Sequence, residues 1–221
     1  MSAQSQATPE PRAPLSRDRV LRAAVDLADR DGLDALTMRR LAQELGVEAM
    51  TLYYHVANKR DLLSGIVDIV VRDIRLPKPG EPWKAALRTA AISAHEILVR
   101  HPWSASLFLS GDPRQGRLDY MNGILGTLRE GGFSTEMTHH AYHALDSHIL
   151  GFTLWQVGIL TATDDLDRTA ADFLAQLDRT GYPHLAEHVD WHLADHPQEK
   201  SEFEFGLDLI LDGLERLLAV A

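Results

Sequence analysis

A glycine between two short apolar segments is the feature that most constrains how this chain folds. Gly46 stands within Leu45-Gly46-Val47, and glycine adopts the positive φ that a sharp helix–turn–helix junction requires. Thr37 is a candidate N-cap for the first helix of the pair, which we expect to end at Leu45. The second helix fits the segment from Glu48 to His55. The spacing therefore predicts two short helices joined by a tight turn.

Helical signals continue on both sides of this pair, and we find no alternating pattern typical of a strand. Ser16 is expected to cap a preceding helix that Gly32 ends, and Asn58 to cap a following helix that ends before Pro77. Apolar periodicity predicts further helices at about 83–99, 102–109, 114–130, 134–160, 168–179, 183–195 and 199–219. The expected fold class is all-α, without internal repeats.

The segment Lys78-Pro79-Gly80-Glu81-Pro82 is a cluster of helix breakers, and we interpret it as a domain boundary. We expect a disordered N-terminal tail over residues 1–14, a first domain over 15–76 and a second domain over 77–221. The helix–turn–helix falls at about 37–56 within the first domain.

The charge of the chain is unevenly distributed. Lysine and arginine total 22 against 32 acidic residues, which gives a net charge of −10. Residues 12–60 carry nine basic and seven acidic side chains, whereas residues 61–221 carry 13 basic and 24 acidic ones. The overall acidity therefore belongs to the second domain and does not exclude nucleic-acid binding by the first.

The chain contains no cysteine, which excludes disulfides, thiolate metal sites and thiol-based redox sensing. It also lacks an apolar run of about 18 residues, so we predict no membrane-spanning helix and no membrane partner. The polar N-terminus does not have the apolar core of a secretory signal. We therefore expect a cytoplasmic location.

The second helix of the pair presents a short aromatic and polar surface. Small residues at its start allow it to approach base edges in a major groove, and Arg39, Arg40, Lys59 and Arg60 flank it where phosphates run. The surface comprises Ala49, Met50, Thr51, Tyr53, Tyr54 and His55. Spacing alone leaves a second interpretation open, in which these tyrosines are half-buried aromatics and the arginines form a solvated face.

These segments resemble the TetR family of one-component bacterial repressors. The resemblance is dense over residues 15–76 and 203–217. The matching residues are Leu36-Thr37, Leu41-Ala42, Leu45-Gly46-Val47, Thr51-Leu52-Tyr53-Tyr54-His55-Val56 and Asn58-Lys59-Arg60-Asp61-Leu62-Leu63.

The resemblance implies a three-helix DNA-binding head and a larger helical domain for ligand binding and dimerisation. It further implies a ligand-responsive repressor that binds a palindromic operator in double-stranded DNA as a homodimer. Ala49 and Met50 are apolar, so at positions that touch bases they can only contact a thymine methyl or exclude a base. The implied DNA-binding residues are Arg39, Arg40, Glu48, Ala49, Met50, Thr51, Tyr53, Tyr54, His55 and Lys59.

Two positions depart from the tetracycline-repressor branch of the family. Its metal-binding histidine and a ligand-binding glutamine fall near Phe108 and Ile124, which are both apolar. We therefore expect a small, largely apolar or aromatic effector, with no magnesium chelate and no cofactor. The candidate effector-binding residues are Trp103, Leu107, Phe108, Ile124, Leu128, His148, Phe152 and Trp155.

Helices 134–160 and 199–219 are apolar over more than one stripe, which favours burial against a second subunit. A purely intramolecular core remains the alternative. Because the dimer would carry two weakly basic heads, we expect useful operator affinity to need both of them.

The chain contains eleven histidines, and they are the main evidence for an alternative function. His139 and His143 are four residues apart, a spacing found in zinc sites, and a metal- or pH-responsive regulator is the alternative function. A second group of four histidines repeats the same spacing further along the chain. Successive side chains in this group turn by about 40° around the helix axis, so the four do not easily share one ion. We expect no metal site. The second group consists of His184, His188, His192 and His196.

An enzyme is not expected, because the chain has no nucleophile elbow, phosphate loop or dinucleotide fingerprint. A helical adaptor with a vestigial head is a third reading. Salt-sensitive DNA binding distinguishes a regulator from such an adaptor.

Overall fold

The computed structural model describes residues 14–110, 113–162, 166–194 and 201–220. Every regular element within these ranges is a helix, and none of these residues lies in a strand. The predicted all-α fold class is therefore confirmed. Most of the predicted N-terminal tail, and His196, lie outside the described residues.

Two compact units divide the chain between Ile66 and Val67. The division falls inside one helix, α4 (Lys59–Arg72), whereas the sequence places the boundary near residues 76 and 77. Leu62 is buried with the first unit and Val70 with the second, so one uninterrupted helix contributes to two cores. The proline cluster at residues 78–82 lies between α4 and α5 (Trp83–Arg100).

The first unit is built from short helices with well-defined ends. The Ser16 hydroxyl accepts a hydrogen bond from the Arg19 amide at 3.2 Å, and the Thr37 hydroxyl accepts one from the Arg40 amide at 3.2 Å. Gly46 has a φ of 67° and ends its helix in the left-handed conformation. The elements are α1 (Arg17–Asp31), η1 (Leu33–Ala35), α2 (Met38–Leu45), α3 (Ala49–Leu52) and the beginning of α4.

The helix α3 is shorter than the segment predicted from Glu48 to His55. The amides of the three residues after Leu52 bond to carbonyls three residues earlier, which tightens the chain out of the α-helical path. The Val56 amide then bonds to the Leu52 carbonyl at 2.9 Å, and the Val56 side chain is fully buried. Burial of Val56 therefore favours a turn where sequence periodicity predicts helix.

The helix α4 also ends earlier than predicted. Asp73 and Ile74 donate their amides to carbonyls three residues earlier, and the Ile74 side chain is buried. The Arg75 amide donates to the Ser93 hydroxyl at 2.9 Å. These contacts take the chain out of the helix several residues before Pro77.

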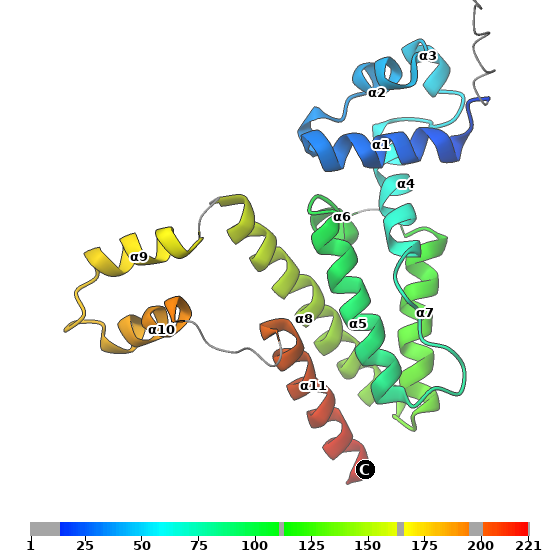
Figure 1. Cartoon of the computed structure of the whole chain (residues 1–221). Helices are drawn as coiled ribbons and strands as arrows, with labels where there is room; N and C mark the ends of the chain where they lie inside the picture. Colours follow the sequence, from blue (N-terminus) through cyan, green and yellow to red (C-terminus); the bar gives the residue numbers. More distant parts are fainter. Residues whose placement is uncertain (1–13, 111–112, 163–165, 195–200, 221) are drawn as a thin grey trace, which may run out of the picture. The chain divides into compact units, whose positions relative to one another are not determined.

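The second unit packs four long helices side by side, α5, α7, α8 and α11, and α9 pairs with α10 (Figure 1). Alanines on the buried face of α5 allow close approach of its neighbours, and Trp83 meets Phe133 edge-on at 4.9 Å. After the end of α4, the helices of this unit are α5 (Trp83–Arg100), α6 (Ser104–Ser110), α7 (Gln115–Glu130), α8 (Thr135–Ala162), α9 (Leu166–Gln176), α10 (Pro183–Leu193) and α11 (Glu202–Ala219).

Candidate DNA-binding surface and effector cavity

The segment around α3 exposes large side chains to solvent. Met50 is 70% exposed, Tyr53 45% and Tyr54 88%, whereas Leu52 and Val56 anchor the segment in the core. Exposure of two tyrosines and a methionine on one short segment has no structural use within the unit. It leaves these side chains available to a partner.

The other residues predicted to contact DNA are all accessible in the first unit. Glu48 is exposed, and Ala49, Thr51 and His55 are half-buried. Arg39 and Lys59 are exposed and form no ion pair with any described residue. Their charges are therefore available to phosphates.

Arg40 differs from its neighbour. Its guanidinium contacts the Asp31 carboxylate at 2.7 Å, and Asp31 also contacts Arg30 at 3.1 Å. Because both pairs are largely exposed, their contribution to stability is small. Arg40 must exchange this partner in order to bind a phosphate.

An ion pair connects the end of the recognition segment, which comprises α3 and the turn that follows it up to His55, to α1 and α4. The Arg17 guanidinium contacts both Asp61 carboxylate oxygens, at 3.0 and 2.9 Å, and donates to the His55 carbonyl at 2.6 Å. The Asn58 side chain accepts from the Asp61 amide at 2.9 Å and caps α4, as predicted. The segment is thus held at its exit by α1 and α4.

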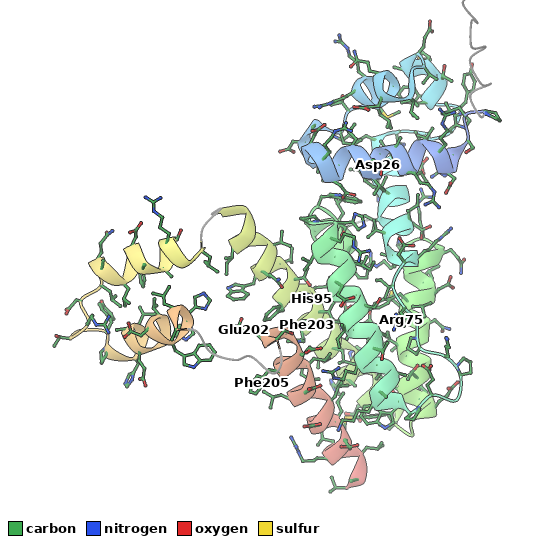
Figure 2. All side chains as sticks on the ribbon, in the orientation of Figure 1. Asp26, Arg75, His95, Glu202, Phe203 and Phe205 are labelled. Atoms are coloured by element: carbon green, nitrogen blue, oxygen red, sulfur yellow. The ribbon has the colours of Figure 1, made fainter. Side chains whose placement is uncertain are left out.

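The second unit contains a cavity of about 330 Å³ between α5, α8, α9, α10 and the start of α11. Aromatic side chains form much of its wall, and this composition is typical of small-molecule sites. Figure 2 shows His95 on α5 close to Glu202 and Phe203 on α11. The lining residues are His95, Phe152, Trp155, Gln156, Ile159, Leu166, His192, Ser201, Glu202 and Phe203.

Stacked rings build one side of this cavity. The Phe203 ring stacks on His95 with centroids 3.9 Å apart and on His148 with centroids 4.9 Å apart. His148 Nε2 also lies 2.9 Å from the Phe203 carbonyl oxygen, to which it donates. Gly206 makes this packing feasible, because a Cβ there would lie 2.6 Å from the His148 ring. The first turn of α11 is therefore fixed against α5 and α8.

The hydrogen bonds of His95 define which ring nitrogen carries its proton. Thr153 Oγ1 donates to the Ile149 carbonyl at 2.6 Å, so at 2.8 Å from His95 Nδ1 it must accept. His95 Nδ1 therefore carries the proton, and Nε2 keeps its lone pair. Burial lowers the pKa of His95 from its ordinary value, His148 lowers it further, and Gln156 partly opposes them. His95 is thus a neutral imidazole at neutral pH, and it donates Nδ1–H to Thr153.

The structure brings some of the predicted effector-binding residues together. Phe152 and Trp155 line the cavity, with their rings 5.4 Å apart, and His148 supports Phe203 behind it. The other predicted residues do not line it. Trp103, Phe108, Ile124 and Leu128 are buried elsewhere in the unit, and Leu107 is half-buried.

The surroundings of Phe108 and Ile124 are closely packed. Phe108 meets Tyr120 edge-on at 5.9 Å and lies under the Arg117 guanidinium at 5.0 Å. Ile124 borders a void of only about 10 Å³, which can hold little more than a water molecule. The region that a loose alignment with tetracycline repressors indicates is therefore filled by side chains.

Sequence reasoning missed His95, Gln156, Glu202 and Phe203. His95 lies close to two other polar residues on α5, Ser93 and Glu96, so no local contrast singles it out in the sequence. Its partner Phe203 is more than one hundred positions away, and no local pattern connects the two.

The histidine pair on α8 places the rings of His139 and His143 4.6 Å apart. Within the described residues, no group of three or more histidine and acidic side chains is arranged to hold a metal ion. Among all the helices that the structure describes, none has the length and apolar character needed to cross a membrane.

Two family models match the chain. Residues 20–66 match the family described as bacterial regulatory proteins of the tetR family, and residues 76–218 match the tetracyclin repressor-like C-terminal domain. The chain belongs to the TetR family. The resemblance drawn from the helix–turn–helix residues is thereby confirmed, and with it the function of a ligand-responsive DNA-binding repressor.

Individual TetR-family relatives align over most of their length. The class D tetracycline repressor of Escherichia coli is 35% identical over 92% of this chain and 90% of its own. The repressor DrrR1 of Streptomyces coeruleorubidus is 34% identical over 95% and 80%, respectively. The structure of the TetR-family protein ActR of Streptomyces coelicolor with actinorhodin superposes with a TM-score of 0.76. Its identity is 28%, and it covers 93% of this chain and 99% of its own.

Proposed function

We propose that this TetR-family protein represses transcription as a homodimer on a palindromic operator and that an apolar or aromatic effector releases it. The observation that carries the proposal is the aromatic-walled cavity of about 330 Å³ in the second unit. Its volume lies within the range of small-molecule sites. The bound actinorhodin in ActR, a structural neighbour, supports a ligand site in this type of domain.

The operator-binding domain spans residues 15–76 in this proposal, and the effector-binding and dimerisation domain spans residues 77–221. Tyr53, Tyr54 and Met50 contact the major groove or its edges, while Arg39 and Lys59 contact phosphates. Exposure of all five side chains supports these roles. Thr51 and His55 supply shorter polar contacts from the same segment.

Unpartnered apolar side chains on α8 and α11 support the homodimer. Phe205 is 62% and Leu209 56% exposed, and Leu217 continues the same four-residue stripe on α11. On α8, Leu154 is also exposed, and the Cα of Gly151 faces open space. Two such helices from each subunit form an isologous four-helix interface.

Effector and operator are coupled through α4, which begins in the first unit and continues into the second. Effector binding favours a dimer state whose head separation no longer fits the operator half-sites. Thermodynamic reciprocity then requires the operator to weaken effector binding by the same factor. The protein acts in the cytoplasm, where its DNA target is accessible, and performs no enzymatic reaction.

A panel of tricyclic aromatic compounds, with magnesium–tetracycline included, tests this function. Thermal melting reports binding, and the anisotropy of a labelled upstream DNA fragment reports release. We expect at least one aromatic compound to raise the melting temperature and release the DNA, and Phe152→Ala to weaken both effects. Magnesium–tetracycline giving the strongest stabilisation would contradict the proposed effector class.

A further inference from the structure

The cavity has a charge preference of its own. Glu202 contributes a carboxylate to the lining, and no lysine or arginine is among the described lining residues. Glu202 is exposed to solvent and forms no ion pair with any described residue. Among the described lining residues, the fixed charge is therefore negative.

Two cations on α5, outside the lining of the cavity, are engaged by acids of α11. Arg88 on α5 contacts Asp208 at 2.8 Å and Glu204 at 3.5 Å, and Lys84 contacts Asp212 at 2.7 Å. The helix dipole places partial positive charge at the start of α11, but Glu202 and Glu204 both stand in that first turn. Among the described residues that line the cavity, none carries a fixed positive charge that would attract an anion.

The Glu202 carboxylate is a fixed hydrogen-bond acceptor in the cavity. His95 donates Nδ1–H to Thr153 and also interacts with the Gln156 side chain, whereas the Glu202 carboxylate can only accept. Gln156, Ser201 and His192 can adapt to either role. A ligand that brings donors therefore satisfies the cavity better than one that brings acceptors.

Aromatic walls reinforce this preference for a cation. The rings of Phe152, Trp155 and Phe203 line the same cavity as Glu202. The faces of the Phe152 and Trp155 rings carry negative electrostatic potential and attract ammonium groups, whereas the Phe203 ring is stacked on His95 and His148. The strongly acidic second domain also raises the local concentration of cations over anions.

We propose that the effector is a cationic aromatic amine, with its ring system against Phe152, Trp155 and Phe203 and its charged nitrogen at Glu202. This inference rests on the proposed function, because it specifies the ligand of the proposed effector site. A neutral aromatic compound fills the same walls without the ion pair, and an aromatic carboxylate faces repulsion from Glu202.

Three ligands of matched shape test the charge preference: 2-naphthylmethylamine, 2-naphthalenemethanol and 2-naphthoate. Calorimetric titration of the full chain at about pH 8, above the ordinary range of imidazole titration, gives their affinities without DNA. We expect the amine to bind at least about fivefold more tightly than the alcohol. The carboxylate should bind most weakly.

Glu202→Gln locates the preference. We expect this variant to lose most of the advantage of the amine while retaining its affinity for the alcohol. Glu136→Gln is the matched control, because Glu136 also stands in the first turn of a helix but does not line the cavity. This control should keep the parent's preference.

Equal or tighter binding of the carboxylate overturns the inference, as does an undiminished amine preference in Glu202→Gln. Absence of binding by all three ligands also overturns it, because the aromatic walls should hold the naphthalene ring alone. These outcomes are separable from the repressor function, which is measured on operator DNA. Failure of operator binding with an intact amine preference would reject the function and leave the ligand class standing.

Discussion

Arg17 and Asp61 form a two-pronged ion pair that joins the first residue of α1 to the first turn of α4, with N–O distances of 3.0 and 2.9 Å. The same guanidinium donates to the His55 carbonyl at 2.6 Å, and Asp61 also accepts from the Ala57 amide at 2.9 Å. One pair of side chains thereby fixes the exit of the recognition segment. The exposed tyrosines just before it depend on this anchor for their position.

Arg17→Ala should loosen the recognition segment. The pair is partly exposed, so solvent screening limits the loss of unfolding free energy to about 1 kcal/mol. All four tryptophans lie in the second unit, so amide hydrogen exchange in α3 is a better readout than tryptophan fluorescence. Arg22→Ala is the control, because Arg22 pairs with Asp18 on the exposed face of α1 itself. Equal exchange in both variants would show that Arg17 has no anchoring role.

Tyr53→Ala should weaken operator binding by about tenfold while leaving the fold and the oligomeric state unchanged. The side chain is 45% exposed, and its removal opens no core cavity. Fluorescence anisotropy with upstream DNA measures the affinity. Tyr182→Ala removes another exposed tyrosine, in the second unit, and should bind as the parent does. If Tyr53→Ala binds operator as tightly as the parent, α3 is not the recognition element.

Leu209→Glu should convert the dimer into a monomer, because it places a charge in the apolar stripe of α11. Sedimentation equilibrium measures the mass of the particle, and operator binding should fall with the loss of the second head. Leu118→Glu on α7 alters a side chain of similar exposure and should leave the dimer intact. A Leu209→Glu protein that remains dimeric would place the interface elsewhere.

Acidification should destabilise the second unit through His95. Burial lowers the folded-state pKa of His95 below its ordinary value of 6.5, so in the window beneath 6.5 the unfolded chain binds more protons. The free energy of unfolding should therefore fall as the pH drops through this window and be fully retained above it. Denaturant unfolding at several pH values, followed by tryptophan fluorescence, measures the slope. His95→Phe keeps the ring contact with Phe203 and should flatten the profile; an unchanged slope would assign the effect to other groups.

Local interactions account for what the sequence predicts well. Ser16, Thr37 and Asn58 cap helices through their own neighbouring amides, and Gly46 supplies the left-handed turn. These features depend on residues within a few positions of each other, so spacing alone identifies them. The all-α fold and the helix–turn–helix follow from the same local rules.

Long-range packing accounts for what the sequence does not predict. The short α3 depends on burial of Val56, and the unit boundary falls within a continuous α4. The cavity depends on the contact between His95 and Phe203, which come from separate helices. Phe152 and Trp155 were identified from their apolar helix, but their polar companions were not.

The central claim is that two weakly basic heads on one dimer bind an operator. Its most direct test is the affinity of the full-length dimer for the palindrome in its own upstream DNA, measured over a series of salt concentrations. If each head places Arg39 and Lys59 on phosphates, the slope of log K against log salt should be about −4. A slope near zero, or no binding to any upstream palindrome, would contradict the account.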